Sequence, residues 1–258
     1  MPRFSTNISM MFTEHALLDR FAAARDAGFG AVEIQFPYEV ALDAMGDAQA
    51  RSEMPLAVMN FPVGDLLTGG PGLAAMPGRE GAFQAGVAEA RRYAEVLRPG
   101  NVNVIVGWPP ATLTREACMA SLASNLHFAA AAMSEIGVGV TVEPVNTRDR
   151  PGYFLSSSTQ GIAAIDAAGH ENLKIEYDLY HMQIMEGDMA ATLEKLIDRI
   201  GHIQFADTPG RGEPGTGEIN FPYLFDAIDR FGYDGWVGAE YNPTGHTGRS
   251  LDWLQPYV

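Results

Sequence analysis

The sequence has little cysteine, few basic residues and no long apolar run, and each shortage excludes a class of protein. Cys118 is the single cysteine in 258 residues, so no disulfide can form within the chain and a reducing compartment suits it. No uninterrupted apolar stretch reaches the roughly 20 residues that span a bilayer. The opening MPRFSTNISMMF lacks the basic and long apolar regions of a signal peptide. We therefore expect a soluble cytoplasmic protein without a membrane partner.

Basic residues are outnumbered by acidic ones, 17 to 32, which gives a net charge of −15. A field of that sign repels phosphate backbones, so nucleic acid is not expected as a partner. It also repels a small anionic substrate, which would then need a basic anchor where it binds. The hydrophobic share of 47% and the charged share of 19% are ordinary for a globular chain.

Strand-like and helix-like segments alternate from one end of the chain to the other. The segments between the expected strands have helical periodicity, notably Arg79–Leu97 and Arg115–Ile136, with Thr114 placed to N-cap the second. The expected strands are Phe4–Ile8, Ala31–Phe36, Leu56–Asn60, Val102–Val106, Gly139–Glu143, Leu173–Asp178, Gly201–Ala206 and Gly235–Glu240.

Eight alternating repeats predict a parallel sheet with crossover helices, and eight is the number that closes a barrel. The competing fold is a doubly wound open sheet. No Gly-rich phosphate fingerprint follows the first strand, where the sequence reads SMMFTEH, and this disfavours the competitor. No linker divides the chain, so we predict a single (β/α)8 TIM barrel domain over residues 1–258.

Four polar side chains stand at the ends of successive apolar runs. These residues are Glu143, Asp178, Gln204 and Glu240, at the ends of the fifth to eighth expected strands. The carboxyl ends of parallel barrel strands meet at one face, where active sites are built. Three carboxylates and an amide oxygen are hard ligands, which suit a divalent cation such as Mg²⁺ or Mn²⁺. Taken singly, each residue could instead anchor a neighbouring loop.

Side-chain alternation carries the polar pattern deeper into the barrel. Thr141, Glu176 and His202 share the inward faces of these strands, and Lys174 shares the face of Glu176. Buried charges are costly unless they are paired or bound to metal. Two interpretations stay open: a Lys174–Glu176 ion pair neutralises the interior, or a cation lies among the outermost carboxylates.

Two further residues lie beside the strand ends. His181 follows Asp178 by three residues, where it can donate to a substrate oxygen or remain a satisfied turn side chain. Arg211 is the best-placed anchor for a substrate carboxylate, unless it pairs with Glu213 or Glu218.

Two loops are long and rich in glycine and proline. Phe61–Gly78 follows the third strand and Arg211–Asn220 follows the seventh. Long loops within a compact domain are usually functional or disordered, and in a barrel both would lie at the catalytic face. The first is a candidate lid over the site.

In their local contexts these residues resemble the hydroxypyruvate isomerase family of the xylose-isomerase-like barrels. The resemblance implies a (β/α)8 barrel with a divalent cation held by Glu143, Asp178, Gln204 and Glu240. Many isomerases and epimerases of the wider superfamily have histidine at the position of Gln204, and glutamine agrees with the hydroxypyruvate isomerase branch. The matching stretches lie between residues 3 and 241 and read RFSTNISMMF, PGRE, VEPVN, YDLYHMQIMEG, GHIQFADTPGRGEPGTGEIN and YDGWVGAEY.

The implied reaction interconverts hydroxypyruvate and tartronate semialdehyde (2-hydroxy-3-oxopropanoate) by metal-assisted proton transfer through an enediolate. Glu143 and Glu240 are then the expected acid and base. Arg211 and His181 would hold the carboxylate and hydroxyl groups of a small anionic hydroxy-keto acid.

Other functions stay open from the sequence. The sister activity is isomerisation of 2-oxo-tetronate, and a ketose or sugar-acid epimerase could use the same two glutamates. A metal-dependent endonuclease on this fold is disfavoured by the charge of −15 and by the lack of a basic stripe. A sugar-acid-binding barrel without activity is the alternative outside enzymes. Metal identity and oligomeric state, including a homo-oligomer, are not determined by the sequence.

Overall fold

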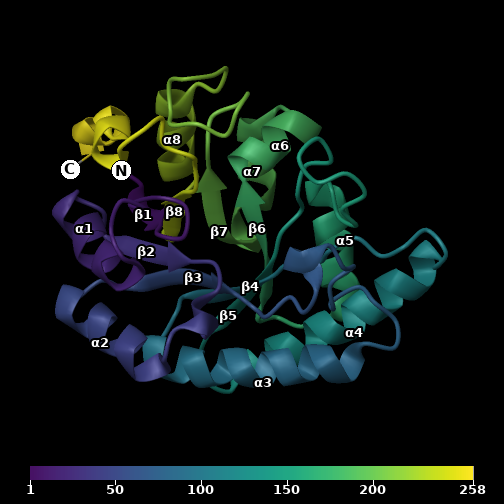
Figure 1. Cartoon of the computed structure of the whole chain (residues 1–258). Coiled ribbons are helices and arrows are strands. Elements are labelled where there is room, and N and C mark those ends of the chain that lie inside the picture. The colour runs from purple at the N-terminus through teal and green to yellow at the C-terminus, as the bar shows by residue number, and fades with distance from the viewer. Residues whose placement is uncertain (258) are drawn as a thin grey trace.

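The chain forms a closed barrel of eight parallel strands with helices around it (Figure 1). The computed structural model describes residues 1–257. Each strand pairs with the next along the chain, and the last pairs with the first. The predicted (β/α)8 barrel is confirmed, and every expected strand is present with ends shifted by at most two residues. The strands are β1 Arg3–Asn7, β2 Ala31–Ile34, β3 Leu56–Asn60, β4 Asn101–Val104, β5 Gly139–Val142, β6 Leu173–Asp178, β7 Ile200–Phe205 and β8 Trp236–Ala239.

Helices connect successive strands and cover the outside of the ring. Thr114 caps α4 by accepting a hydrogen bond from the Ala117 backbone N–H, as predicted. Two helices follow β6, and within residues 1–257 only 3₁₀ turns follow β8. The helices are α1 Arg20–Asp26, α2 Leu42–Ser52, α3 Glu80–Leu97, α4 Arg115–Ser134, α5 Ser158–Ala168, α6 Leu179–Met185, α7 Met189–Leu196 and α8 Phe221–Arg230.

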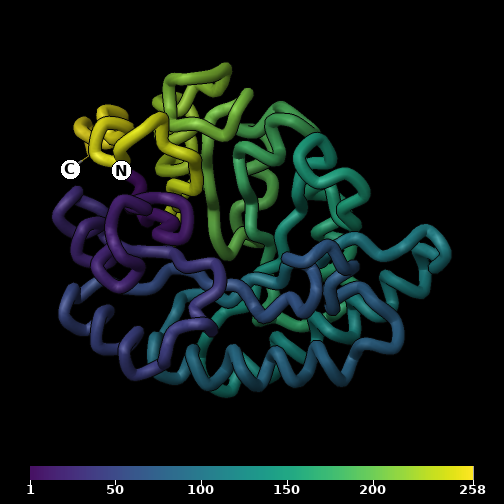
Figure 2. The backbone as a smooth tube through the Cα atoms, viewed as in Figure 1, coloured from purple at the N-terminus to yellow at the C-terminus, as the bar shows by residue number. Residues whose placement is uncertain are grey.

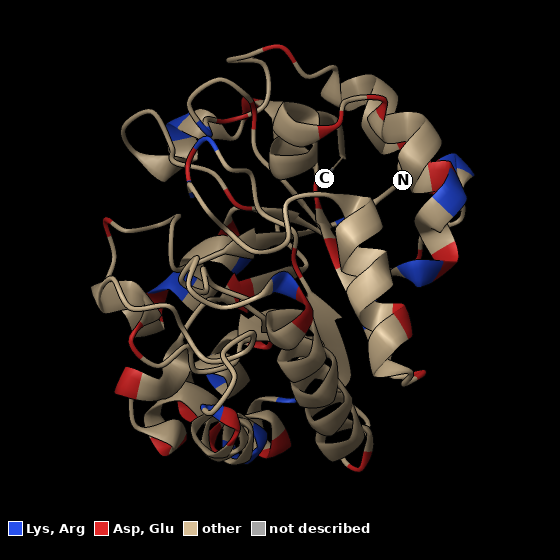
Figure 3. Ribbon diagram, turned by 90° about the vertical axis from the view of Figure 1, so that its right-hand side faces the viewer, with Lys and Arg blue, Asp and Glu red and all other residues tan. Residues whose placement is uncertain are grey.

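Both ends of the chain lie on the same side of the barrel (Figure 2). Phe4 of β1 packs edge-to-face against Trp253, with ring centroids 5.2 Å apart. This contact fastens the C-terminal turns to the first strand. Basic and acidic residues intermingle on the outer helices and loops (Figure 3). Among the helices of residues 1–257, none has the length and apolar character needed to cross a bilayer.

The strands turn apolar side chains toward the helices and polar side chains into the barrel. On β7, Phe205 packs against Phe221 and Phe225 of α8. His202 and Gln204 alternate with Phe205 and are also buried. The apolar core therefore lies between the ring and its helices, and the interior of the ring holds the polar groups.

Of the four further polar residues that side-chain alternation places inside the barrel, all but Lys174 are buried there. Thr141, Glu176 and His202 are buried as predicted. Of the two interpretations left open by the sequence, the Lys174–Glu176 ion pair does not form, because Lys174 is exposed at the start of β6 while Glu176 Oε2 accepts a hydrogen bond from Thr141 Oγ1 at 2.8 Å. Two residues of strand advance the chain by roughly 7 Å, which carries Lys174 to solvent at the amino end of the barrel.

Candidate active site

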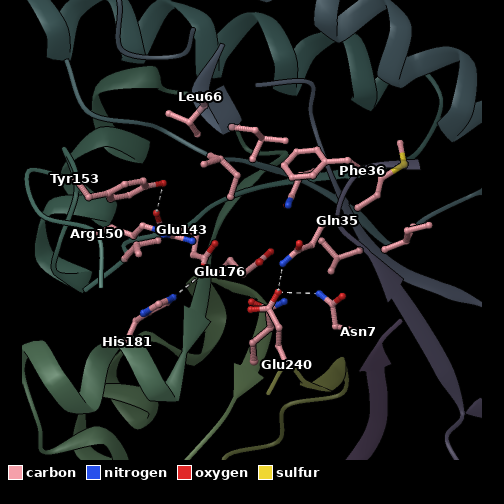
Figure 4. Close-up of a pocket in the computed structure, with 18 of the residues that line it drawn as sticks. Asn7, Gln35, Phe36, Leu66, Glu143, Arg150, Tyr153, Glu176, His181 and Glu240 are labelled. Carbon is pink, nitrogen blue, oxygen red and sulfur yellow. Dashed lines mark hydrogen bonds and ion pairs between the residues drawn. The ribbon is translucent and has the colours of Figure 1, made fainter. Parts of the chain in front are cut away.

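A cavity of about 410 Å³ opens at the carboxyl ends of the strands. Five of the six residues that we expected at the site line it, and the sixth, Asp178, is buried beside His181 and Arg211. Figure 4 shows acidic, amide and imidazole groups converging on this space. The polar groups that line it include Asn7, Gln35, Asn60, Glu143, Arg150, Glu176, His181, Gln204, Arg211 and Glu240, and the apolar wall includes Phe36, Leu66, Leu67, Ile105 and Trp108.

Glu143 and Glu240 follow strands β5 and β8, which lie three strands apart in the ring. Glu143 Oε2 accepts a long hydrogen bond from Asn103 Nδ2, at 3.3 Å. Glu240 has more donors: Asn7 Nδ2 at 2.7 Å and Gln35 Nε2 at 3.0 Å reach its Oε1. The two carboxylates thus reach the cavity from separate strands, and Glu240 is the better hydrogen-bonded of the two.

Arg211 supplies the main positive charge beside these acids. Its Nη2 forms a hydrogen-bonded ion pair with Glu240 Oε2 and lies 3.5 Å from Asp178 Oδ2. Its guanidinium also stacks over the Tyr180 ring, 5.3 Å from the centroid. The alternative pairing with Glu213 or Glu218 does not occur among residues 1–257.

The buried carboxylate of Asp207 binds the backbone of the loop that carries Arg211. Asp207 Oδ2 accepts hydrogen bonds from the backbone N–H groups of Gly215 and Gly217, and Asp207 Oδ1 accepts one from Ile219. A side chain at Gly217 would put its Cβ 2.2 Å from the Thr208 carbonyl oxygen. The GTG part of the loop therefore needs glycine at 217 to close around Asp207.

His181, in the first turns of α6, lies between two of the acids. Its Nε2 is 3.5 Å from Glu143 Oε1 and 3.4 Å from Asp178 Oδ2. Its Nδ1 accepts from the backbone N–H of Asn146 at 3.4 Å and lies 2.7 Å from Asn146 Nδ2. An accepting Nδ1 fixes the neutral tautomer with the proton on Nε2. His181 therefore directs an N–H toward these carboxylates without forming a hydrogen bond to Asp178 Oδ2.

Burial shifts the titration of every acid in this cluster. The pKa of Glu143 is raised well above its ordinary value, first by burial and then by Glu240 and Asp178. Burial raises the pKa of Asp178 to about 7 although Arg211 opposes the shift. The pKa of Glu240 is raised by burial as well, and burial lowers the pKa of His181. Without a cation, burial therefore shifts each carboxyl group toward its protonated form and His181 toward the neutral imidazole.

Two oxygens in this cluster form no hydrogen bond within residues 1–257: Asp178 Oδ2 and Gln204 Oε1. Both are buried, and such atoms are costly unless something binds them. Glu143, Asp178 and His181 also bring one potential ligand atom each within 4.8 Å of one another. The oxygen donors fit a hard divalent cation, whereas the proton on His181 Nε2 makes the imidazole the poorest ligand of that group.

Several site residues were missed by sequence reasoning. Asn7 and Asn103 lie on inward strand positions, so side-chain alternation could have found them. Glu33 stands as one charge in the apolar run AVEI, which was a usable signal. Arg150 lies in the loop after β5 and lines the cavity, but nothing in its local sequence distinguishes it from Arg148.

The Phe61–Gly78 loop reaches the cavity through Leu66, Leu67 and Gly69. An ion pair of 2.8 Å between Asp65 and Arg79 ties its two ends together. Whether this loop moves as a lid stays a prediction.

Comparison with known proteins agrees with this geometry. The sequence matches the family model described as xylose isomerase-like TIM barrel over residues 21–257. It is 48% identical over 258 residues to the 2-oxo-tetronate isomerase of Cupriavidus necator, covering 100% of this chain and 99% of that protein. It is 44% identical over 257 residues to the hydroxypyruvate isomerase of Escherichia coli, covering 100% of both.

A solved structure is similar over the full length as well. A protein described as AP endonuclease, family 2, from Brucella melitensis superposes with a TM-score of 0.97 at 40% identity, covering 100% of this chain and 99% of that one. The predicted resemblance to hydroxypyruvate isomerases is confirmed.

Proposed function

Because the chain belongs to the hydroxypyruvate isomerase family of the xylose isomerase-like TIM barrels, we propose that it interconverts hydroxypyruvate and tartronate semialdehyde. It is an isomerase, and the finer proposal concerns its substrate, its catalytic residues and its cation. The observation that carries it is a pair of buried glutamates, Glu143 and Glu240, reaching one cavity from separate strands.

The reaction moves one proton from C3 to C2 of the substrate and a second between the two oxygens. We assign the carbon proton transfers to Glu143 and Glu240, one removing a proton from C3 and the other delivering one to C2. Their raised pKa values support this assignment, since burial makes each carboxylate a stronger base than a carboxylate in water. An enediolate lies between the two transfers.

We further propose that Glu143, Asp178, Gln204 and Glu240 hold a divalent cation, Mg²⁺ or Mn²⁺. The free oxygens of Asp178 and Gln204 support this set, while Glu240 is already bound by Asn7, Gln35 and Arg211. When bound, such a cation polarises the substrate carbonyl and stabilises the developing oxyanion.

The anionic end of the substrate needs positive charge in a chain of net charge −15. Arg211 and the Nε2–H of His181 face the cavity and would contact substrate oxygens. Arg150 also lines the cavity, and within residues 1–257 it has no carboxylate within ion-pair distance. We assign Arg150 to the substrate carboxylate together with Arg211, whose charge is shared with Glu240.

The test is turnover of hydroxypyruvate and of 2-oxo-tetronate by chelator-treated protein, before and after adding Mg²⁺ or Mn²⁺. We expect hydroxypyruvate isomerisation that is lost on chelation and restored by either ion. The second candidate, 2-oxo-tetronate isomerase, is favoured by the 48% identity to a relative of that name. A larger kcat/KM for 2-oxo-tetronate would make it the substrate. Activity that survives exhaustive chelation would contradict the cation assignment.

A further inference from the structure

A buried carboxylate lies beneath the site and is not used by the reaction proposed above. Glu33 of β2 is 0% exposed. Its Oε1 accepts a hydrogen bond from Ser5 Oγ of β1 at 2.6 Å and lies 2.8 Å from His202 Nε2 of β7. Its Oε2 accepts a hydrogen bond from Gln204 Nε2 at 2.8 Å. Both oxygens of Glu33 are therefore occupied by donors from two other strands.

The fold makes room for this carboxylate at one position. Gly238 of β8 faces Glu33, and a Cβ at Gly238 would lie 1.8 Å from Glu33 Oε1. A clash of this size with a fully buried group cannot be relieved by a small shift. Because residue 238 has no side chain, Glu33 can occupy its position beneath Gln204.

The contact with Glu33 determines which end of the Gln204 amide faces the cavity. A carboxylate accepts hydrogen bonds and does not donate them, so the amide must turn its NH₂ group toward Glu33. Its carbonyl oxygen is then left on the cavity side, where it is buried and forms no hydrogen bond within residues 1–257. The opposite orientation would present N–H groups to a cation and would place two acceptor oxygens against each other.

We propose that Glu33 is a positioning residue that holds the Gln204 carbonyl oxygen toward the cavity and so makes this amide a ligand for a divalent cation. The inference rests on the cation site proposed above. A glutamine whose amide rotates freely would bind a cation poorly, whereas the hydrogen bond to Glu33 fixes the orientation of the Gln204 amide. Gly238 leaves the space in which Glu33 makes this contact.

The experiment is a double-mutant cycle on Mn²⁺ affinity, measured by calorimetry with the full chain after chelation. Its variants are Glu33→Gln, Gln204→Ala and the pair together. Glutamine at 33 can pair with Gln204 in either orientation, so we expect Glu33→Gln to weaken Mn²⁺ binding about tenfold, the lower end for outer partners of metal ligands. In the Gln204→Ala background the same change should weaken binding less than about threefold, because no amide remains to orient.

The cycle separates orientation from the simple loss of a negative charge, since the charge effect would persist without Gln204. Ser5→Ala is the matched control: it removes one hydrogen bond to Glu33 but leaves the Gln204 contact, and it should change Mn²⁺ affinity less than about threefold. Glu33→Asp is a second variant that keeps the charge but withdraws the acceptor by one methylene, and it should also weaken binding. Circular dichroism identifies the variants that fold.

The inference is overturned if Glu33→Gln and Glu33→Asp bind Mn²⁺ as the wild-type chain does, or if the losses from Glu33→Gln and Gln204→Ala multiply in the double variant. Failure of the wild-type chain to bind Mn²⁺ would instead overturn the cation site itself, and with it the inference. The two failures are therefore distinguishable.

Discussion

At the scale of single residues, the site is a set of acids kept away from water. Glu143, Asp178 and Glu240 are each at most 6% exposed, and the guanidinium of Arg211 forms ion pairs with Asp178 and Glu240. Neighbouring buried carboxylates bind protons more strongly than carboxylates in water do, unless a cation takes the place of the protons.

Replacing either catalytic glutamate by its amide should remove turnover and leave the fold intact. Glu143→Gln and Glu240→Gln keep the size of the side chain and lose the ability to exchange a proton. We expect kcat to fall by about 10²- to 10⁴-fold, the usual contribution of general acid–base catalysis. Initial rates and circular dichroism measure the two properties, with the exposed Glu218→Gln as control. A variant with full activity would exclude its residue from the mechanism.

Asp178 should make the cation-free protein less stable as the pH rises. Its pKa in the folded state, about 7, is raised above the ordinary value of about 3.9 for an aspartate. The folded state therefore binds more protons than the unfolded state between these values, and stability present below about pH 4 is lost as the pH rises through 7. After chelation, Asp178→Asn should reduce this loss by an amount on the order of a few kcal/mol.

The measurement is the free energy of unfolding by urea at pH 5 and pH 8 for both proteins. An identical pH dependence in the wild-type chain and Asp178→Asn would contradict the raised pKa.

At the scale of elements, the strands and the positions of the two long loops could be predicted from the sequence, but contacts between distant elements could not. The strand ends at Glu143, Asp178 and Glu240 were predictable because a carboxylate interrupts an apolar run there. The contact of Glu33 with His202 was not, because it joins residues 169 positions apart. Pairing across that distance depends on the closure of the ring, which no local pattern encodes.

In the loop between β5 and α5, the residue that lines the cavity also could not be predicted from the local sequence. Its turn is fixed by Asn146, whose Oδ1 accepts from the Asp149 backbone N–H at 2.7 Å, and by Tyr180, whose hydroxyl donates to Asp149 at 2.6 Å. These contacts hold the segment that carries Arg150 against α6. Arg148 lies on the same loop and does not line the cavity.

Arg150→Met should therefore raise KM for hydroxypyruvate while Arg148→Met should not. Losing one hydrogen-bonded charge pair corresponds to about 10- to 100-fold in affinity. Steady-state kinetics of the two variants under matched conditions provide the comparison. Equal KM values for both variants would assign the carboxylate to other residues.

At the scale of the whole molecule, the barrel gathers polar side chains from around the ring at one cavity, while the whole chain carries a large negative charge. The net charge of −15 opposes the approach of an anionic substrate. Salt shortens the range of that repulsion, from about 30 Å at 0.01 M to about 8 Å at 0.15 M.

Raising the ionic strength over this range should increase kcat/KM for hydroxypyruvate a few-fold. The effect should be smaller for an uncharged competitive ligand, whose binding serves as control. A decrease in kcat/KM with salt would indicate that the local charges of Arg150 and Arg211 dominate over the field of the whole chain.

The proposed reaction depends on two glutamates that face one cavity, one removing the C3 proton of the substrate and the other delivering a proton to C2. The most direct measurement is proton NMR of hydroxypyruvate incubated in D₂O with the chain loaded with Mg²⁺. Because the acid that delivers the proton exchanges with solvent, the account predicts tartronate semialdehyde that carries deuterium at C2, and neither product nor label with Glu143→Gln or Glu240→Gln. Conversion without deuterium, or no conversion by the wild-type chain, would contradict it.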